Sequence, residues 1–254
     1  MTYSLCLWLE IWTKMCGIVG YTGTDDRLLL EAMNRVQSHR GPDEAGDRSF
    51  LREQVHMATR RLGIIDLPEG QQPMLNEDES LCLVFNGEIF NAPELRSELE
   101  ARGVSFRTDH SDTEVVLRLY ETKQDGLLDD LIGMFAFVIL DRAQGLLFGA
   151  RDHFGIKPLH YHLHDGRFSF ASEVKSLLTL PWITPDLDHQ AVYDFLTFQA
   201  IAAPHTIYKG IRKIPAAHCF QLRLDTNEFR VKRYWRPRFS TSPRPYEEQV
   251  RRVR

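Results

Sequence analysis

The sequence lacks three features, each of which would have placed it in a different class of protein. It has no apolar run approaching the roughly 18 residues of a membrane-spanning helix, so we expect no membrane segment. Its four cysteines lie far apart with no C-x-x-C pair, which excludes a disulfide scaffold or zinc ribbon and favours the reducing cytoplasm. It has no basic excess: 31 Lys and Arg against 35 Asp and Glu give a net charge of −4, which argues against nucleic-acid binding.

The composition that remains is that of an ordinary globular protein. Hydrophobic residues make up 43% and charged residues 26% of the 254 residues, which excludes a disordered, collagen-like or low-complexity chain. This length is sufficient for one large domain or two small ones around a substantial hydrophobic core.

Short apolar segments alternate with a few amphipathic ones along most of the chain. Residues rich in β-branched and aromatic types predict strands over 16–23, 55–67, 80–90, 134–141, 145–152, 159–165 and 167–173. Apolar residues at helical spacing predict helices over 26–39, 92–103 and 111–123. Asn91 occupies the cap position of the second helix, and Ser111 and Glu114 have the spacing of a capping box in the third. Many strands with helices between groups of them predict a layered α+β fold.

Both ends of the chain differ in composition from the middle. Ten of the first fifteen residues are apolar or aromatic, but the basic start and small-residue cleavage site of a signal peptide are missing. Because Met15 directly precedes Cys16, we expect residues 1–15 to be a removable propeptide, or a segment upstream of the true start. Residues 236–245 are rich in Pro, Ser, Thr and Arg and lead into a helical pattern. We expect 236–254 to be a linker and the start of a truncated synthetase domain.

Eight short motifs follow one another along the chain from Met15 to Leu177. They are MCGIVG, HRGPDEAG, RRLGIIDL, NGEIFN, SDTEVV, GMFAF, RDHFGIKPLHY and FASEVKSL. This ordered series resembles the class II glutamine amidotransferase domain, and within that group the N-terminal half of glutamine-dependent asparagine synthetase. The resemblance covers residues 16–235. It implies a four-layer αββα N-terminal-nucleophile hydrolase fold, with two stacked antiparallel sheets between helices.

The resemblance also implies a catalytic centre that hydrolyses a primary amide. A cysteine before Gly-Ile-Val is by itself typical of a small buried hydrophobe. In this series Cys16 matches the family nucleophile, which attacks the side-chain amide of glutamine to give a thioester and ammonia. The implied base is the α-amino group of Cys16 once that residue is first in the chain, because an α-amino group has a pKa of about 8.

Asn86 and Gly87 match the donors that stabilise the tetrahedral oxyanion. A strand that ends at this pair would leave a side-chain amide and a backbone N–H without ladder partners. Asn-Gly seen alone is also typical of a hairpin turn.

The remaining matched positions are those expected to bind L-glutamine. Arg61 matches the arginine that binds the α-carboxylate, and because strand alternation puts neighbours on opposite faces, we expect Arg60 to face solvent. Glu88 and Asp112 match the acids that hold the α-ammonium, although a residue at a helix start can also be a simple cap. The expected substrate-binding set is Arg61, Ile65, Asn86, Gly87, Glu88 and Asp112.

Three further polar residues near these motifs are expected to be structural. Arg40 and Asp43 are expected to shape the loop near the pocket. His39, at a helix end, is typical of a capping or packing residue rather than a base.

The sequence contains no Gly-Gly pair, whereas asparagine synthetase needs a glycine-rich loop for ATP in a second domain. We therefore expect no cofactor and no metal in this chain, with ATP and Mg²⁺ belonging to a synthetase domain in cis or in trans. A homodimer is compatible with this organisation. The sequence leaves three functions open: the ammonia-supplying half of an asparagine synthetase, an amidotransferase for another acceptor such as a sugar phosphate, or an inert docking module or truncated relic.

Overall fold

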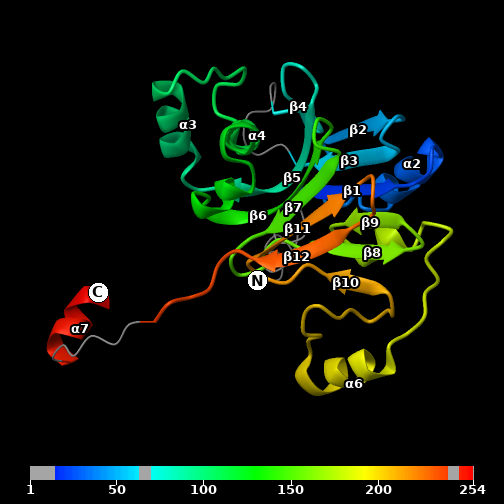
Figure 1. Cartoon of the computed structure of the whole chain (residues 1–254). Helices are drawn as coiled ribbons and strands as arrows, with labels where there is room; N and C mark the ends of the chain where they lie inside the picture. Colours follow the sequence, from blue (N-terminus) through cyan, green and yellow to red (C-terminus); the bar gives the residue numbers. More distant parts are fainter. Residues whose placement is uncertain (1–14, 63–69, 240–245, 254) are drawn as a thin grey trace, which may run out of the picture.

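The apolar strands assemble into two six-stranded antiparallel sheets within the residues that the computed structural model describes, which are 15–62, 70–239 and 246–253 (Figure 1). The first sheet has the strand order β10-β8-β9-β1-β3-β2 and the second has the order β12-β11-β7-β6-β5-β4. The strands of the first sheet are β1 (Gly17–Thr22), β2 (Glu44–Phe50), β3 (Val55–Arg61), β8 (His160–His164), β9 (Arg167–Ala171) and β10 (Ile211–Lys213). Those of the second are β4 (Met74–Leu75), β5 (Leu81–Ile89), β6 (Gly133–Asp141), β7 (Leu146–Arg151), β11 (His218–Arg223) and β12 (Phe229–Arg233).

The central strands read as continuous apolar runs because both of their faces are buried. Side chains alternate between the two faces of a strand. In β5, Leu83 and Phe85 lie on one face, and Cys82 and Val84 lie on the other. Cys82 and Val84 join a cluster that also contains Met57 of the first sheet, so this cluster fills the space between the sheets. Leu83 and Phe85 face the helices on the outer side.

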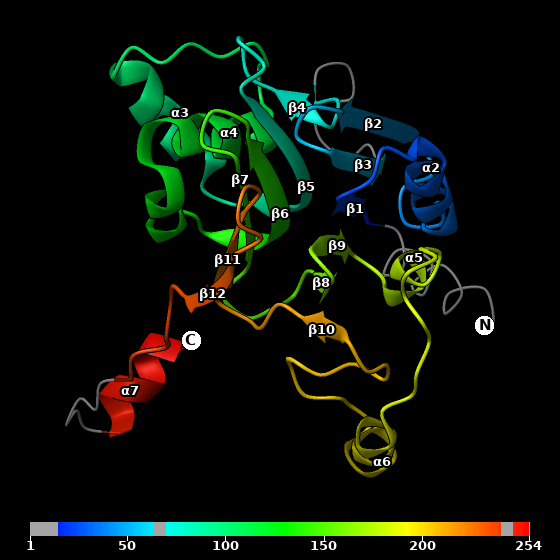
Figure 2. The same cartoon turned by 45° about the vertical axis from the view of Figure 1, so that its right-hand side comes forward.

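Helices cover the outer face of each sheet (Figure 2). Leu30 and Met33 of α2 and Leu177 of α5 pack with Val19 and Ala58 of the first sheet. Helices α3 and α4, with the short 3₁₀ helix η1, pack on the second sheet. These helices are α2 (Arg27–Val36), α3 (Ala92–Ala101), α4 (Asp112–Lys123), η1 (Gln124–Asp129) and α5 (Val174–Leu177). The result is the four-layer αββα arrangement that the resemblance implied, which is confirmed.

The capping box predicted at the start of α4 is wrong. Ser111 is the N-cap residue, but its side chain makes no capping hydrogen bond. The Glu114 carboxylate instead accepts hydrogen bonds from the backbone N–H groups of Arg107 at 2.9 Å and Thr108 at 2.8 Å. It also pairs with Arg118 at 3.1 Å. Glu114 therefore fastens the preceding loop to the helix and does not cap the helix itself.

Asn91 lies at the predicted N-cap position of α3, yet it too caps nothing with its side chain. Its Nδ2 donates to the Asp130 carbonyl at 2.9 Å, and its Oδ1 accepts from the Ile132 N–H at 2.9 Å. The amide thus fixes the start of α3 to the segment that enters β6.

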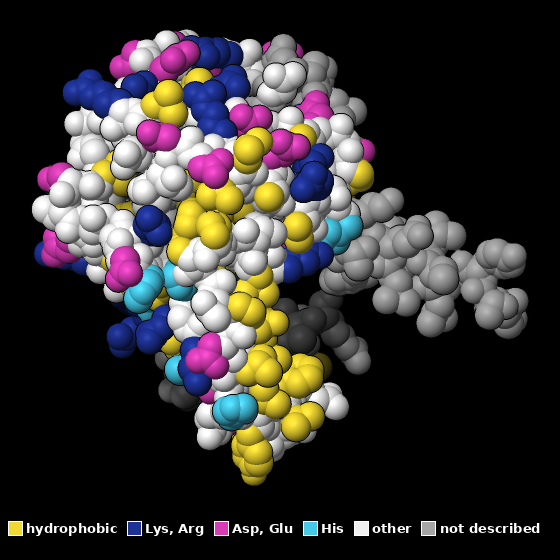
Figure 3. Space-filling view, turned by 90° about the vertical axis from the view of Figure 1, so that its right-hand side faces the viewer, with side chains coloured by type: hydrophobic (Ala, Val, Ile, Leu, Met, Phe, Trp, Pro, Cys, Tyr) yellow, Lys and Arg dark blue, Asp and Glu magenta, His cyan; other side chains and the backbone are white. Residues whose placement is uncertain are grey.

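Helix α6 (His189–Phe198) stands apart from both sheets (Figures 1 and 2). Ala191 is its one buried residue, whereas Tyr193, Leu196 and Phe198 are strongly exposed. Apolar side chains gather over this part of the surface in Figure 3. Helix α7 (Tyr246–Val253) follows the linker segment where a helical pattern was expected. No helix in the described ranges is long and apolar enough to cross a membrane.

Candidate active site

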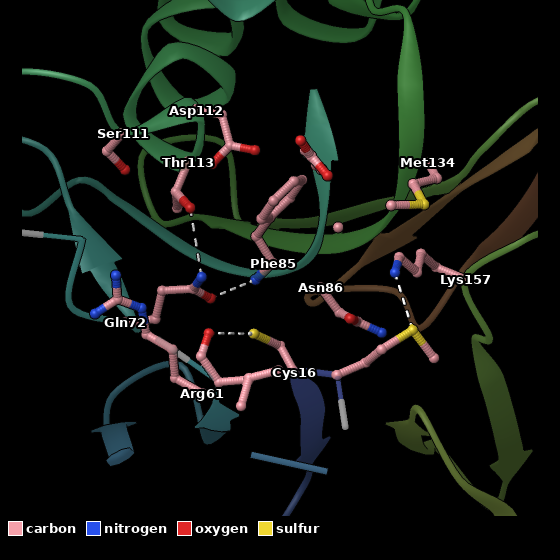
Figure 4. A pocket seen from close by; sticks show the side chains of 14 residues that line it. Cys16, Arg61, Gln72, Phe85, Asn86, Ser111, Asp112, Thr113, Met134 and Lys157 are labelled. Atoms are coloured by element: carbon pink, nitrogen blue, oxygen red, sulfur yellow. Dashed lines mark hydrogen bonds between the residues drawn. The ribbon is translucent and has the colours of Figure 1, made fainter. Parts of the chain in front are cut away.

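A cavity of about 90 Å³ opens between the start of β1 and one edge of β5 (Figure 4). Sites for drug-sized ligands measure roughly 300–1,000 Å³, so this cavity suits a small molecule. The predicted site residues that line it are Cys16, Arg61, Asn86, Gly87, Glu88 and Asp112. The structure therefore brings together every predicted site residue except Ile65, which lies outside the described residues.

Cys16 is held at the floor of this cavity by its backbone. Arg40 Nε donates to the Cys16 carbonyl at 3.0 Å, and the Arg40 carbonyl accepts from the Met15 N–H at 2.8 Å. Arg40 is fixed in turn by an ion pair with Glu173 at 3.1 Å. These contacts fit the structural role expected of Arg40, although they fix the backbone of Cys16 and not only the loop that carries Arg40.

The Cys16 thiol lies with its Sγ 3.9 Å from the Leu62 carbonyl oxygen. Burial raises the pKa of this thiol, while the nearby cations Arg61, Lys157 and Arg40 act in the opposite direction. Because the thiolate is the nucleophilic form, a thiol with a raised pKa needs a base to take its proton.

The predicted strand end at Asn86-Gly87 is wrong, and so is the alternative of a hairpin turn. β5 continues to Ile89, with Asn86 opposite Ala136 and Gly87 opposite Phe135 of β6. Glycine is required here because a Cβ on Gly87 would lie 2.3 Å from the Met134 carbonyl oxygen. Gly87 therefore allows the two strands to approach closely beside the cavity.

The unpaired donors arise from the edge of β5 instead of its end. β4 pairs with β5 over two residues only, so among the described residues the edge beyond them has no strand partner. Side chains replace the missing strand: the Phe85 N–H donates to Gln72 Oε1 at 2.7 Å, and the Ile89 N–H donates to Asp112 Oδ2 at 3.0 Å. Because N–H direction alternates along a strand, the Gly87 N–H between them points to the same side, towards the cavity.

Asn86 supplies the second donor. Its side chain is only 1% exposed, and no described residue accepts a hydrogen bond from Nδ2. A buried donor without an acceptor is uncommon in a folded protein and calls for a ligand or another explanation. Asn86 and Gly87 therefore place two hydrogen-bond donors on the cavity that holds the Cys16 thiol.

The two adjacent arginines of β3 face opposite ways, as predicted, but the prediction that Arg60 faces solvent is wrong, because it is half-buried against α2. Arg61 is buried against the cavity, and its Nη1 pairs with Glu44 Oε2 at 2.9 Å. Arg60 turns to the helix side, where its Nε donates to the Asn34 carbonyl at 3.2 Å. The cavity thus receives the guanidinium of Arg61 alone from this pair.

Two carboxylates line the same cavity as Arg61, and that of Asp112 lies across the cavity from Arg61 (Figure 4). Glu88 belongs to β5, and Asp112 opens α4 while its carboxylate reaches the β5 edge at Ile89. Burial raises the pKa of Asp112, and the nearby Glu88 carboxylate raises it further. A cation bound between the two would favour their ionised forms, so this end of the cavity is suited to an ammonium group.

Sequence reasoning missed two polar residues of the cavity, Lys157 and Gln72. Lys157 lies in the RDHFGIKPLHY motif, which supported the resemblance but received no individual role. Gln72 bridges the Phe85 N–H and Thr113 Oγ1, the latter at 3.4 Å. No local pattern identifies either residue, since each acts through a contact made across the fold.

His39 and Asp43, two of the residues expected to be structural, each contact another residue near the site. His39 is exposed and pairs with Glu173 at 3.0 Å, away from the thiol. The Asp43 N–H donates to the Arg61 carbonyl at 3.3 Å, which fits its expected part in shaping the loop. Among the described residues, no group of three or more His, Cys, Asp or Glu side chains could hold a metal ion.

The chain is similar to known proteins over nearly its whole length. A family model described as a glutamine amidotransferase domain matches residues 15–235. The chain is 39% identical over 247 residues to glutamine-hydrolyzing asparagine synthetase 1 of Bacillus subtilis, covering 94% of this chain and 38% of that protein. It is 34% identical over 250 residues to a putative glutamine-hydrolyzing asparagine synthetase of Mycobacterium tuberculosis, with the same two coverages of 94% and 38%.

Among solved structures, the fold matches a glutamine phosphoribosylpyrophosphate amidotransferase from B. subtilis with a TM-score of 0.62 and 20% identity, over 87% of this chain and 49% of that one. The chain spans about two fifths of the length of the asparagine synthetases that it matches. On the match to residues 15–235 and on its fold, this chain belongs to the class II glutamine amidotransferases, enzymes of the glutamine-hydrolysing class with an N-terminal-nucleophile hydrolase fold.

Proposed function

We propose that Cys16 hydrolyses the side-chain amide of L-glutamine to glutamate and ammonia, and that the ammonia is used to make asparagine. The observation that carries the first part is the buried Asn86 Nδ2 without an acceptor, on the same cavity as a thiol. Leaving such a donor unsatisfied costs about 1–3 kcal/mol in the empty site. A negatively charged oxygen that forms during the reaction would satisfy it.

Substrate binding follows from the charges at the two ends of the cavity. Arg61 binds the α-carboxylate with its planar fork, and Glu88 and Asp112 bind the α-ammonium. Ile65 keeps its expected place in the substrate-binding set as a prediction. With the amino-acid end held in this way, the side-chain amide is directed at Cys16.

The reaction then needs one base and one oxyanion site. The α-amino group of Cys16 takes the thiol proton as sulfur attacks the amide carbon. The Asn86 Nδ2 and the Gly87 N–H hold the resulting oxyanion. The protonated amine then gives its proton to the leaving nitrogen, which departs as ammonia and leaves a thioester. Water hydrolyses the thioester to glutamate and restores the thiol.

This mechanism requires a chain that begins at Cys16. While Met15 is attached, the Cys16 nitrogen is an amide that cannot accept a proton. Met15 also lines the cavity, and its Sδ lies 3.0 Å from Lys157 Nζ. Removing residues 1–15 would therefore supply the base and clear part of the substrate site in one step. A chain that retains them would be the inert form.

Aspartate is the proposed acceptor of the ammonia because the relatives that cover most of this chain are named asparagine synthetases. ATP and Mg²⁺ would act in a synthetase domain, in cis or in trans. The fold likeness to a phosphoribosylpyrophosphate amidotransferase, at 20% identity, does not favour a sugar-phosphate acceptor.

The test is glutamine turnover by protein that begins at Cys16, with the first residue confirmed by intact-mass measurement. We expect glutamate and ammonia from this protein and neither from protein that retains Met15. Cys16→Ala should abolish ammonia release, whereas Cys219→Ala, the same change on β11 outside the cavity, should not. Ammonia release by the Cys16→Ala protein would refute the assignment. An equal rate from protein that retains Met15 would refute the free-amine mechanism.

A further inference from the structure

The buried ammonium of Lys157 has no role in the mechanism above. Lys157 is 6% exposed and lines the cavity beside Cys16. The described atom in contact with its Nζ is Met15 Sδ, at 3.0 Å. A thioether is a weak hydrogen-bond acceptor, and burying a charge without a strong partner is unfavourable. A buried ammonium with such a weak partner is unfavourable for stability, which suggests a functional role for Lys157.

The loop that carries Lys157 is held by two charged side chains next to the cavity that Lys157 lines. Asp152, which is fully buried, accepts from the N–H groups of Ile156 and Lys157, each at 2.9 Å. Arg151 donates to the carbonyls of Gly155 at 2.6 Å and Lys157 at 2.7 Å. Arg151 and Asp152 thus hold the backbone at and before Lys157. A side chain that must be precisely placed in a functional site needs such support.

Five other charged groups surround the thiol and this ammonium: Arg40, Arg61, Glu88, Asp112 and Asp152. Burial lowers the pKa of Lys157, whereas the Cys16 thiolate, Asp152 and Glu88 favour its charged form. The same attraction favours the thiolate of Cys16. The charges of Lys157 and Cys16 therefore influence each other, and both residues line the cavity together with Met15.

We propose that Lys157 is a positioning residue that sets the protonation state of the nucleophile once Met15 has been removed. Its positive charge faces the new α-amino group and thiol of Cys16, keeping the amine neutral and favouring the thiolate, because a nearby like charge disfavours protonation. Lys157 itself neither gains nor loses a proton, since the thiol proton passes to the amine. This inference rests on the proposed function, in which that amine is the base.

The first test is the pH dependence of glutamine hydrolysis by protein that begins at Cys16. Lys157→Met removes the charge and keeps an unbranched side chain. We expect the acidic limb of kcat/KM to move to higher pH by about one unit, with a loss on the order of tenfold at pH 7 and a similar rate at high pH. Lys157→Arg, which keeps the charge, should retain the wild-type profile. Lys213→Met is the control, because Lys213 Nζ donates to the Ile201 carbonyl at 2.7 Å, outside the cavity.

The second test measures the thiol without turnover. Iodoacetamide reacts with thiolates, and Cys82 and Cys219 are at most 4% exposed, so alkylation reports Cys16 in protein that begins there. Lys157→Met should move the alkylation profile to higher pH. A uniform loss of rate with no shift in either profile, or a raised KM alone, would overturn the inference. Wild-type protein that releases no ammonia would refute only the proposed function, since the alkylation profile would still report the effect of Lys157.

Discussion

Replacing Asn86 with leucine separates what this residue does for catalysis from what it does for stability. Leucine keeps the branched shape of asparagine and removes its polar atoms. Asn86 is 1% exposed, and its Nδ2 has no acceptor among the described residues, so no described contact of Nδ2 is broken in the empty site. The substitution therefore removes a donor that is used only when an oxyanion is present.

The two expected effects have opposite signs. Losing one oxyanion donor typically lowers kcat by about 10²–10³, which corresponds to about 2.7–4 kcal/mol. KM should change little, because Arg61, Glu88 and Asp112 remain. Stability should rise, since removing a buried unsatisfied donor relieves a cost of about 1–3 kcal/mol. A gain on the order of 1 kcal/mol would raise Tm by roughly 2–4 °C in a chain of this size.

Asn76 provides a matched control. It is also buried, but its amide donates to Ser80 at 3.0 Å and Glu121 at 2.9 Å and accepts from the Leu81 N–H at 2.9 Å. Asn76→Leu should therefore lower the free energy of unfolding and leave kcat unchanged. Steady-state ammonia release and urea unfolding on both variants check the pair. A kcat for Asn86→Leu within threefold of wild type, or equal destabilisation by both changes, would show that the oxyanion argument is mistaken.

Two further outcomes follow from charges described above. Arg61→Lys should mainly raise the KM for glutamine, because it weakens ground-state binding of the α-carboxylate. An unchanged KM with a much lower kcat would show instead that Arg61 acts in the chemical step. Arg118→Met should lower the free energy of unfolding by about 3–5 kcal/mol, because it strips the buried Glu114 of its cation; a loss below about 1 kcal/mol in urea unfolding would contradict this. The hydrogen bond from Arg118 lowers the pKa of the half-exposed Glu77 from 4.5 to about 2, so the smaller stabilisation from the Glu77–Arg118 pair is complete above pH 4.5 and is lost as pH falls towards 2. Acid titration of stability should show that loss in the wild type and much less of it in Arg118→Met.

The positions of the strands and helices could be predicted from the sequence, but the contacts that their residues make could be predicted only in part. β5 and β6 are recognisable as apolar runs, but a run that is buried on both faces does not say which face meets the helices. Local capping signals were also misleading. Ser111 and Glu114 have capping-box spacing, yet the carboxylate is more strongly engaged by two backbone N–H groups and by Arg118.

The candidate site shows the same division between local and long-range information. Cys16, Arg61 and Asn86 belong to motifs that the sequence displays, and the cavity brings them together. Lys157 could not be identified, because its position depends on two charged anchors that fold a loop back towards β1. The mistaken strand end at Gly87 has a similar cause, since the donor is exposed by the shortness of a neighbouring strand.

The edge of β5 that has no strand partner among the described residues also bears on self-association through β-sheet extension. An edge with unpaired N–H groups can add a strand from another molecule and so begin aggregation. Here Gln72 and the carboxylate of Asp112 occupy the two flanking N–H groups, so an incoming strand finds only the one at Gly87. Gln72 and Asp112, which flank the proposed oxyanion donor, therefore also oppose the addition of a strand from another molecule.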